Sequence, residues 1–96
     1  MRYTGEEALG LVETLALVPS IAAADKMLKA AAVDLVAFEA GGSTLCTVFV
    51  AGDVDSCRAA VRAGAAAAAA VGVVTARNVM PRPIPSLRSI VNAHAL

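Results

Sequence analysis

The sequence contains few aromatic side chains and few charges. Its 96 residues include two Phe, one Tyr and no Trp, which leaves little surface on which bases or sugars could stack. Charged residues make up 17% of the chain, against about a quarter in an average protein. Eight basic residues balance eight acidic ones. The resulting net charge of zero excludes the broad basic surface with which nucleic-acid-binding proteins contact phosphates.

Two cysteines and one histidine are too few for a metal site of known ligand spacing. The opening residues MRYTGEEALG lack the basic region and the apolar run of a signal peptide. The longest apolar run, Ala63 to Ala76, is too short to cross a bilayer. We therefore expect a cytoplasmic protein with no cofactor, no membrane partner and no nucleic-acid partner, in which Cys46 and Cys57 are reduced thiols.

The residues that could perform catalysis are scattered. His94, the one histidine, lies two residues from the end of the chain, where we expect a solvated side chain. Glu13 lies in an apolar segment, where a lone carboxylate needs a partner, so we expect it at a strand edge or an interface rather than as a general base. Both cysteines also lie in apolar segments, which favours buried, unreactive thiols. The sequence therefore predicts that the protein is not an enzyme.

Apolar residues are abundant instead. They make up 58% of the chain, and 23 of the 96 residues are alanine; the mean hydropathy is +0.72. This is more than a small monomer needs, which indicates contacts with further copies of the chain. Alanine lets backbones approach closely, so the composition predicts packing of small residues between flat layers. A deep ligand cavity would need larger apolar and aromatic walls.

The order of the predicted elements is strand, helix, strand, strand, helix, strand. Strands are expected at 7–15, 33–39, 44–50 and 73–80, and helices at 20–32 and 54–71. Two such βαβ units with no linker between them predict one domain with an α+β, ferredoxin-like (split βαβ) fold. In this fold the helices cover one face of an antiparallel sheet. The other face should be largely open to solvent or to contacts, and residues 85–96 should form a tail or a short helix.

The two helices carry different patterns. In the first, Asp25, Lys26 and Lys29 fall on a polar face, with Asp25 and Lys29 spaced for an i,i+4 ion pair. Its apolar face is expected to hold Ile21, Ala24, Met27, Leu28 and Ala31. In the second helix Asp53 is the expected N-cap and Gly72 the stop. A stripe on that helix is formed by Asp55, Arg58 and Arg62.

The loop Gly41-Gly42-Ser43-Thr44 connects two predicted strands. It is either a plain hairpin turn or a loop whose backbone N–H groups and hydroxyl bind small polar ligands. It lacks the lysine and the spacing of a nucleotide-binding P-loop. The residue pattern alone leaves both interpretations of this loop open.

Six segments follow one another in a characteristic order. They are EALGLVET at 7–14, AADKMLKAA at 23–31, the Gly42-Ser43 loop, LCTVFVAGDV at 45–54, AGAAAA at 63–68 and VMPRP at 79–83. Together they resemble the bacterial microcompartment shell protein family, in its single-domain, hexamer-forming class. The resemblance covers about residues 6–84 and is strongest to shell proteins of propanediol- and ethanolamine-type compartments.

The resemblance implies a cyclic homohexamer, shaped as a flat hexagon, that tiles with other shell proteins around encapsulated enzymes. It implies that Gly42, Ser43 and Thr44 line a central pore for small polar metabolites. It also implies that Lys29 and Arg82 join hexamers along their edges. The competing interpretations are a ferredoxin-like regulatory module that binds a small ligand, which would more often be a dimer or trimer, and a small enzyme.

Overall fold

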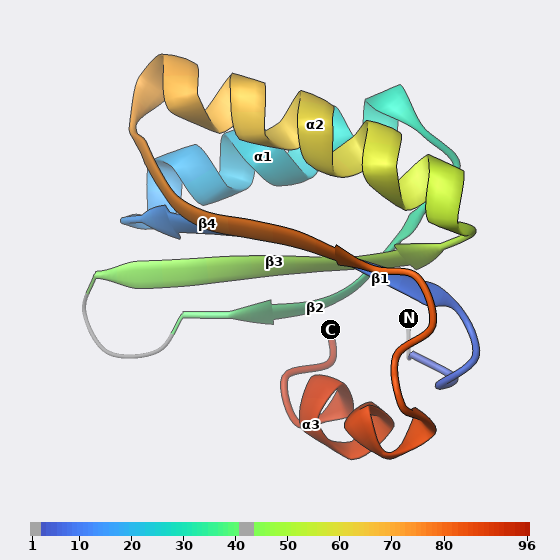
Figure 1. Cartoon of the computed structure of the whole chain (residues 1–96). Coiled ribbons are helices and arrows are strands. Elements are labelled where there is room, and N and C mark those ends of the chain that lie inside the picture. Colours follow the sequence, from blue (N-terminus) through green and yellow to red (C-terminus); the bar gives the residue numbers. More distant parts are fainter. Residues whose placement is uncertain (1–2, 41–43) are drawn as a thin grey trace.

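The computed structural model describes residues 3–40 and 44–96, and in these ranges four strands form one sheet beneath two long helices (Figure 1). The elements are β1 (Ala8–Leu15), α1 (Leu17–Ala30), β2 (Asp34–Glu39), β3 (Leu45–Gly52), α2 (Val54–Val71), β4 (Val73–Met80), a 3₁₀ turn (Pro85–Leu87) and α3 (Arg88–Asn92). The strand order is β2-β3-β1-β4, and every pair is antiparallel. This confirms the predicted α+β, ferredoxin-like arrangement.

The second helix and the last strand have the predicted bounds, whereas the first helix does not. Helix α2 begins after Asp53, whose carboxylate accepts a hydrogen bond from the backbone N–H of Ser56 at 2.9 Å. The hydrogen bonds from Ser56 also lower the pKa of Asp53. Helix α1 begins at Leu17, three residues earlier than predicted, and ends at Ala30, two residues earlier. Pro19 lies in its first turn, where the missing N–H has no intrahelical acceptor to lose.

Helices α1 and α2 lie side by side on one face of the sheet and approach each other closely (Figure 1). A Cβ atom added to Gly64 would lie 2.4 Å from Cγ of Met27, and one added to Gly72 would lie 2.6 Å from Cγ of Pro19. Glycine is therefore required at both contacts. The core between helices and sheet is formed by Val12, Ala23, Met27, Val48, Val50, Ala60, Val61 and Ala68.

The apolar face predicted for α1 is partly wrong. Met27 is fully buried, as expected, but Ile21 is 55% exposed and Leu28 is 44% exposed. The buried face is formed by Pro19, Ser20, Ala23 and Met27, which recur every three or four residues as one helix face requires. The two larger residues fall outside this row and face solvent, because small residues occupy the close contact with α2.

The second face of the sheet is more covered than predicted. The short α3 lies on this side of the sheet (Figure 1). The side chain of Asn92 holds the backbone of Tyr3 through two hydrogen bonds of 3.0 and 2.9 Å. The final residues then run beside the edge strand β2, where the N–H of Phe38 donates to the carbonyl of His94 at 3.2 Å. A second buried cluster results, formed by Tyr3, Leu9, Val36, Ala37, Ala51 and Val91.

The turn from β1 into α1 holds an unusual backbone conformation. Ala16 has φ 77° and ψ 167°, a region that is almost confined to glycine and that costs a residue with a side chain about 1–3 kcal/mol. The hydroxyl of Thr14 donates to the carbonyl of Ala16 at 3.0 Å. The N–H of Ala16 donates to the carbonyl of Thr44, directly before β3. These bonds hold the strained turn in place.

We expect Ala16→Gly to raise the free energy of unfolding by about 1 kcal/mol. Glycine removes the strain of this conformation but loses some chain entropy on folding, so the gain is smaller than the strain itself. Guanidinium denaturation at one fixed protein concentration measures the change. The matched control is Ala70→Gly on the exposed side of α2, which should lower the free energy by about 1 kcal/mol. Equal losses in the two variants would contradict the strain at Ala16.

Candidate functional site

The predicted pore residues belong to the connection between β2 and β3. Gly42 and Ser43 lie outside the described residues, whereas Thr44 lies in an exposed turn immediately before β3. The hydrogen bond from Ala16 to the carbonyl of Thr44 fixes this turn to the end of β1. The structure thus locates both ends of the β2–β3 loop, at Ala40 and Thr44.

One end of the molecule, here called the hairpin end, collects several chain segments. Leu15 at the end of β1 pairs with Leu45 on β3 and with Val73 on β4. Pro19 at the start of α1 touches Gly72 at the end of α2. The hairpin end therefore contains the start of α1, the end of α2 and the start of β3.

Large apolar side chains are exposed at the hairpin end. Single exposed apolar residues are ordinary, but a cluster of this size indicates a contact surface. The members are each between 40% and 69% exposed: Leu15, Leu17, Val18, Ile21, Leu45, Val71 and Val73. Together they are the hairpin-end cluster.

The two predicted edge residues lie at the opposite end of the molecule. Helix α1 and strand β4 both start at the hairpin end, and Lys29 lies in the last turn of the first whereas Arg82 follows the second. Lys29 donates to the carboxylate of Asp25 at 2.9 Å, and both side chains are largely exposed. This confirms the predicted i,i+4 pair. Arg82 is exposed between two prolines, which restrict its backbone.

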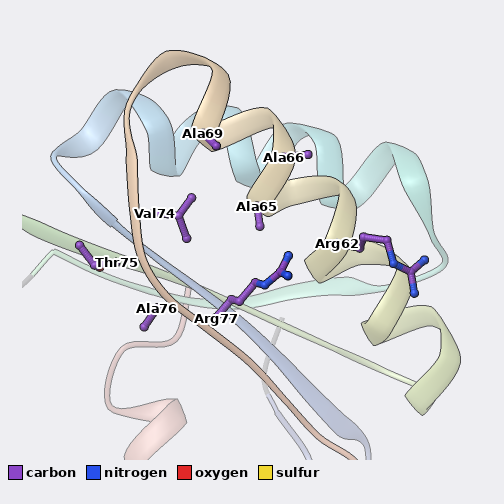
Figure 2. Close-up of a pocket in the computed structure, with 8 residues that line it drawn as sticks. All are labelled: Arg62, Ala65, Ala66, Ala69, Val74, Thr75, Ala76 and Arg77. Atoms are coloured by element: carbon purple, nitrogen blue, oxygen red, sulfur yellow. The ribbon is translucent and has the colours of Figure 1, made fainter.

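A shallow groove of about 540 Å³ lies between α2 and the edge strand β4. Alanine and valine side chains form its floor. Two arginines, Arg62 on α2 and Arg77 on β4, line its sides (Figure 2). The side chain of Arg77 extends across the groove toward α2 in Figure 2. The remaining lining residues are Ala65, Ala66, Ala69, Val74, Thr75 and Ala76.

The sequence pattern indicated Arg62 but missed Arg77 and the groove. The missing signal is tertiary, since β4 becomes an edge strand only through the strand order. The register of β4 against β1, which shifts between Glu13 and Thr14 of β1, then sets which of its side chains face α2. Glu13 lies on the other face and accepts a hydrogen bond from the hydroxyl of Thr75 at 2.8 Å. Because β1 lies between β3 and β4, the expected strand-edge position of Glu13 is wrong, and its expected position at an interface stays a prediction.

The thiols are buried, as the sequence predicts. Cys57 is fully buried, and its Sγ lies 3.5 Å from the carbonyl of Ala8. Burial raises the pKa of Cys57, and the negative charges of Asp53 and Glu7 raise it further, so the unreactive thiol form is favoured. Cys46 is also buried.

Within residues 3–40 and 44–96 the histidine, cysteine and carboxylate side chains form no cluster suited to a metal ion. His94 is exposed, as expected for a solvated side chain. Over the same ranges, none of the helices combines the length and the apolar character that a bilayer crossing requires.

The fold and its surfaces define a small α+β domain with exposed apolar residues at one end and a groove along one side. Residues 8–83 match the family model described as the BMC domain. The chain is 53% identical over 85 residues to the bacterial microcompartment shell protein PduA of Citrobacter freundii, which covers 88% of this chain and 91% of that protein. It is 49% identical over 84 residues to the shell protein EutM of Escherichia coli, covering 88% and 87%.

A solved structure agrees with these relatives. The crystal structure of a microcompartment protein from Desulfitobacterium hafniense superimposes with a TM-score of 0.80 at 32% identity and covers 93% of this chain. This chain spans about half of that protein, namely 48%. The chain therefore belongs to the BMC domain family, which confirms its resemblance to bacterial microcompartment shell proteins.

We expect neither thiol to react with Ellman's reagent in the native protein at mildly alkaline pH, because burial excludes the reagent and disfavours the thiolate. Both should react at once in concentrated guanidinium. The variant Cys46→Ala isolates Cys57, and Ser86→Cys adds an exposed thiol as the positive control. Native Cys57 reacting as fast as this introduced thiol would contradict the burial of its side chain.

Proposed function

We propose that this chain is a non-enzymatic tile of a bacterial microcompartment shell. Six copies form a closed ring around the hairpin end, and the rings join edge to edge with each other and with further shell proteins around encapsulated enzymes. The observation that carries this proposal is that two different sets of residues lie at opposite ends of the domain. The hairpin-end cluster lies at one end, and Lys29 and Arg82 lie at the other.

A ring converts one short loop into six. Gly42, Ser43 and Thr44 of each copy then surround the symmetry axis, and six Ser43 hydroxyls with neighbouring backbone N–H groups line a narrow polar opening. Small polar metabolites exchange water for these groups, whereas bulky cofactors are excluded by size. The turn at Thr44, held by Ala16, supports this placement of the loop.

The outer end of each copy supplies the contacts between rings. The Lys29 ammonium and the Arg82 guanidinium donate charge-assisted hydrogen bonds to backbone carbonyls of the neighbouring ring. Such bonds are directional and sensitive to salt. The exposure of both residues at one end of the molecule supports this role.

We expect the purified chain to have a mass of about six times 9.6 kDa and to keep this mass on dilution, because the apolar hairpin-end cluster becomes buried in the ring. Multi-angle light scattering after gel filtration measures the mass. A stable dimer or trimer whose melting temperature rises with a small ligand would favour the regulatory-module alternative instead. A stable monomer would contradict both.

We expect Lys29→Asp to abolish sheets and tubes in electron micrographs while the ring keeps its mass. The variant removes the donor and places a second carboxylate one turn from Asp25, a repulsion that costs the helix only about 0.2–0.5 kcal/mol. The matched control is Lys26→Asp, an exposed lysine on the same helix, which should leave the sheets intact. Unchanged sheets in Lys29→Asp would contradict its role, and loss of the ring would place Lys29 inside it.

A further inference from the structure

The two sides of the helical layer present different charged side chains beside their exposed apolar residues. On the α2 side, Arg62 and Arg77 border the groove described above (Figure 2). On the α1 side, an exposed surface patch is formed by residues of α1 alone, namely Leu17, Val18, Ile21, Ala22 and Asp25. Its one charged residue is the acid Asp25. The groove and this patch are otherwise mostly apolar, and the patch offers a carboxylate where the groove offers two guanidinium groups.

The exposed residues of α1 form a ridge that points away from α2. Pro19, Ala23 and Met27 face α2 and the sheet. Val18, Ile21 and Asp25 recur at intervals of three and four on the opposite side of the helix, which defines one face. Val18 is 69% exposed. The groove on the far side of α2 is floored by alanines, which leave room for side chains of this size.

The ridge and the groove lie at the same distance from the hairpin end. Met27 packs against Gly64 on the antiparallel α2. Asp25 precedes Met27 by two residues, and Ala66 follows Gly64 by two. Because the helices are antiparallel, Asp25 and Ala66 lie at the same distance from the hairpin end. Arg62 lies one helical turn farther from the hairpin end than Ala66. Rotation about an axis at the hairpin end preserves this distance and therefore brings ridge and groove of adjacent copies to the same level.

We propose that the α1 ridge of one copy docks in the α2–β4 groove of the next copy, with Ile21 on the alanine floor and Asp25 between Arg62 and Arg77. The docking rests on the ring proposed above and identifies its lateral contact. Each copy offers the ridge on one side and the groove on the other, so the contact is heterologous and closes into a ring.

The chemistry of the contact follows from the two surfaces. Docking removes exposed apolar area of Ile21 and Val18 from water. It also gives the two arginines of the groove a carboxylate, the group that a guanidinium binds best. Asp25 already accepts a hydrogen bond from Lys29, but a carboxylate accepts about four, so this pair does not saturate it.

Charge reversal on each side tests the docking. The ridge variant is Asp25→Arg, and the groove variant combines Arg62→Glu with Arg77→Glu. Each variant alone places like charges in every lateral contact, and we expect the mass by light scattering to fall from the ring to the monomer at micromolar concentration. Circular dichroism and thermal unfolding establish that each variant is folded.

Mixing the two variants in equal amounts should restore the ring. In an alternating ring, the ridge with the introduced arginine meets the groove with the introduced glutamates, and the unchanged Asp25 ridge meets the unchanged arginine groove. Every contact is then complementary again. Because neither variant forms a ring alone, a ring in the mixture requires contacts between the two different variants. The matched controls are Asp55→Arg at the start of α2 and Arg88→Glu on α3, both outside the ridge and the groove, which should keep the mass of the parent protein.

The outcomes separate this docking from the ring itself. If the parent protein is a hexamer and both variants remain hexamers, or if the mixture stays monomeric, the docking is wrong and the ring stands. If the parent protein forms another oligomer that the variants lose and the mixture regains, the docking stands and the hexamer is wrong. Should a reversal variant fail to fold, the neutral set Asp25→Asn and Arg62→Gln with Arg77→Gln replaces it. We expect each neutral change to raise the concentration of half-dissociation about tenfold, and no increase would overturn the docking.

Discussion

The close approach of α1 and α2 is the constraint on which the rest of the structure depends. Gly64 leaves no room for a Cβ atom against Met27, and Gly72 leaves none against Pro19. These two contacts lie eight residues apart on each helix, so they fix both the spacing and the level of the antiparallel pair. Because both helices run along the strands, the helix ends coincide with the ends of the sheet. This alignment therefore gives the domain two distinct ends, the hairpin end and the opposite end.

The same constraint determines which apolar residues remain outside. A helix pair held together by alanine and glycine buries little side-chain volume between its members. The larger residues of α1, such as Ile21 and Leu28, lie on the outer side of the helix. There they add little buried apolar area to the core of a single chain. The apolar surplus that the composition showed is therefore located on surfaces rather than in a larger core. Exposed apolar clusters of this kind are typical of surfaces that contact other protein chains.

The elements that the sequence predicted correctly are those with local signals. Helix α2 starts at a side-chain cap on Asp53 and ends at Gly72, and both signals act within a few residues. The start of α1 was missed because Ala16 adopts a backbone conformation that is rare for alanine and that the sequence therefore does not predict. The exposure of Ile21 was missed because apolar residues on α1 occupy more than one face. The position of Arg77 beside the groove depends on the strand order and on the register of β4, and no local sequence pattern predicts either. The family resemblance supplied the candidate pore and edge residues, and only the edge residues and Thr44 lie within the described structure.

The lateral and the edge contacts proposed for the shell meet at one carboxylate. Asp25 pairs with Lys29 at 2.9 Å in the isolated chain, and an exposed pair of this kind contributes only about 0.2–1 kcal/mol. On the proposed docking, Arg62 and Arg77 of the neighbouring copy compete for the same carboxylate and hold it in a less solvated place. Lys29 then loses part of its partner, and its ammonium is released toward carbonyl acceptors at the outer edge. On these proposals, closure of the ring favours tiling, and single chains join edges less readily before they have formed rings.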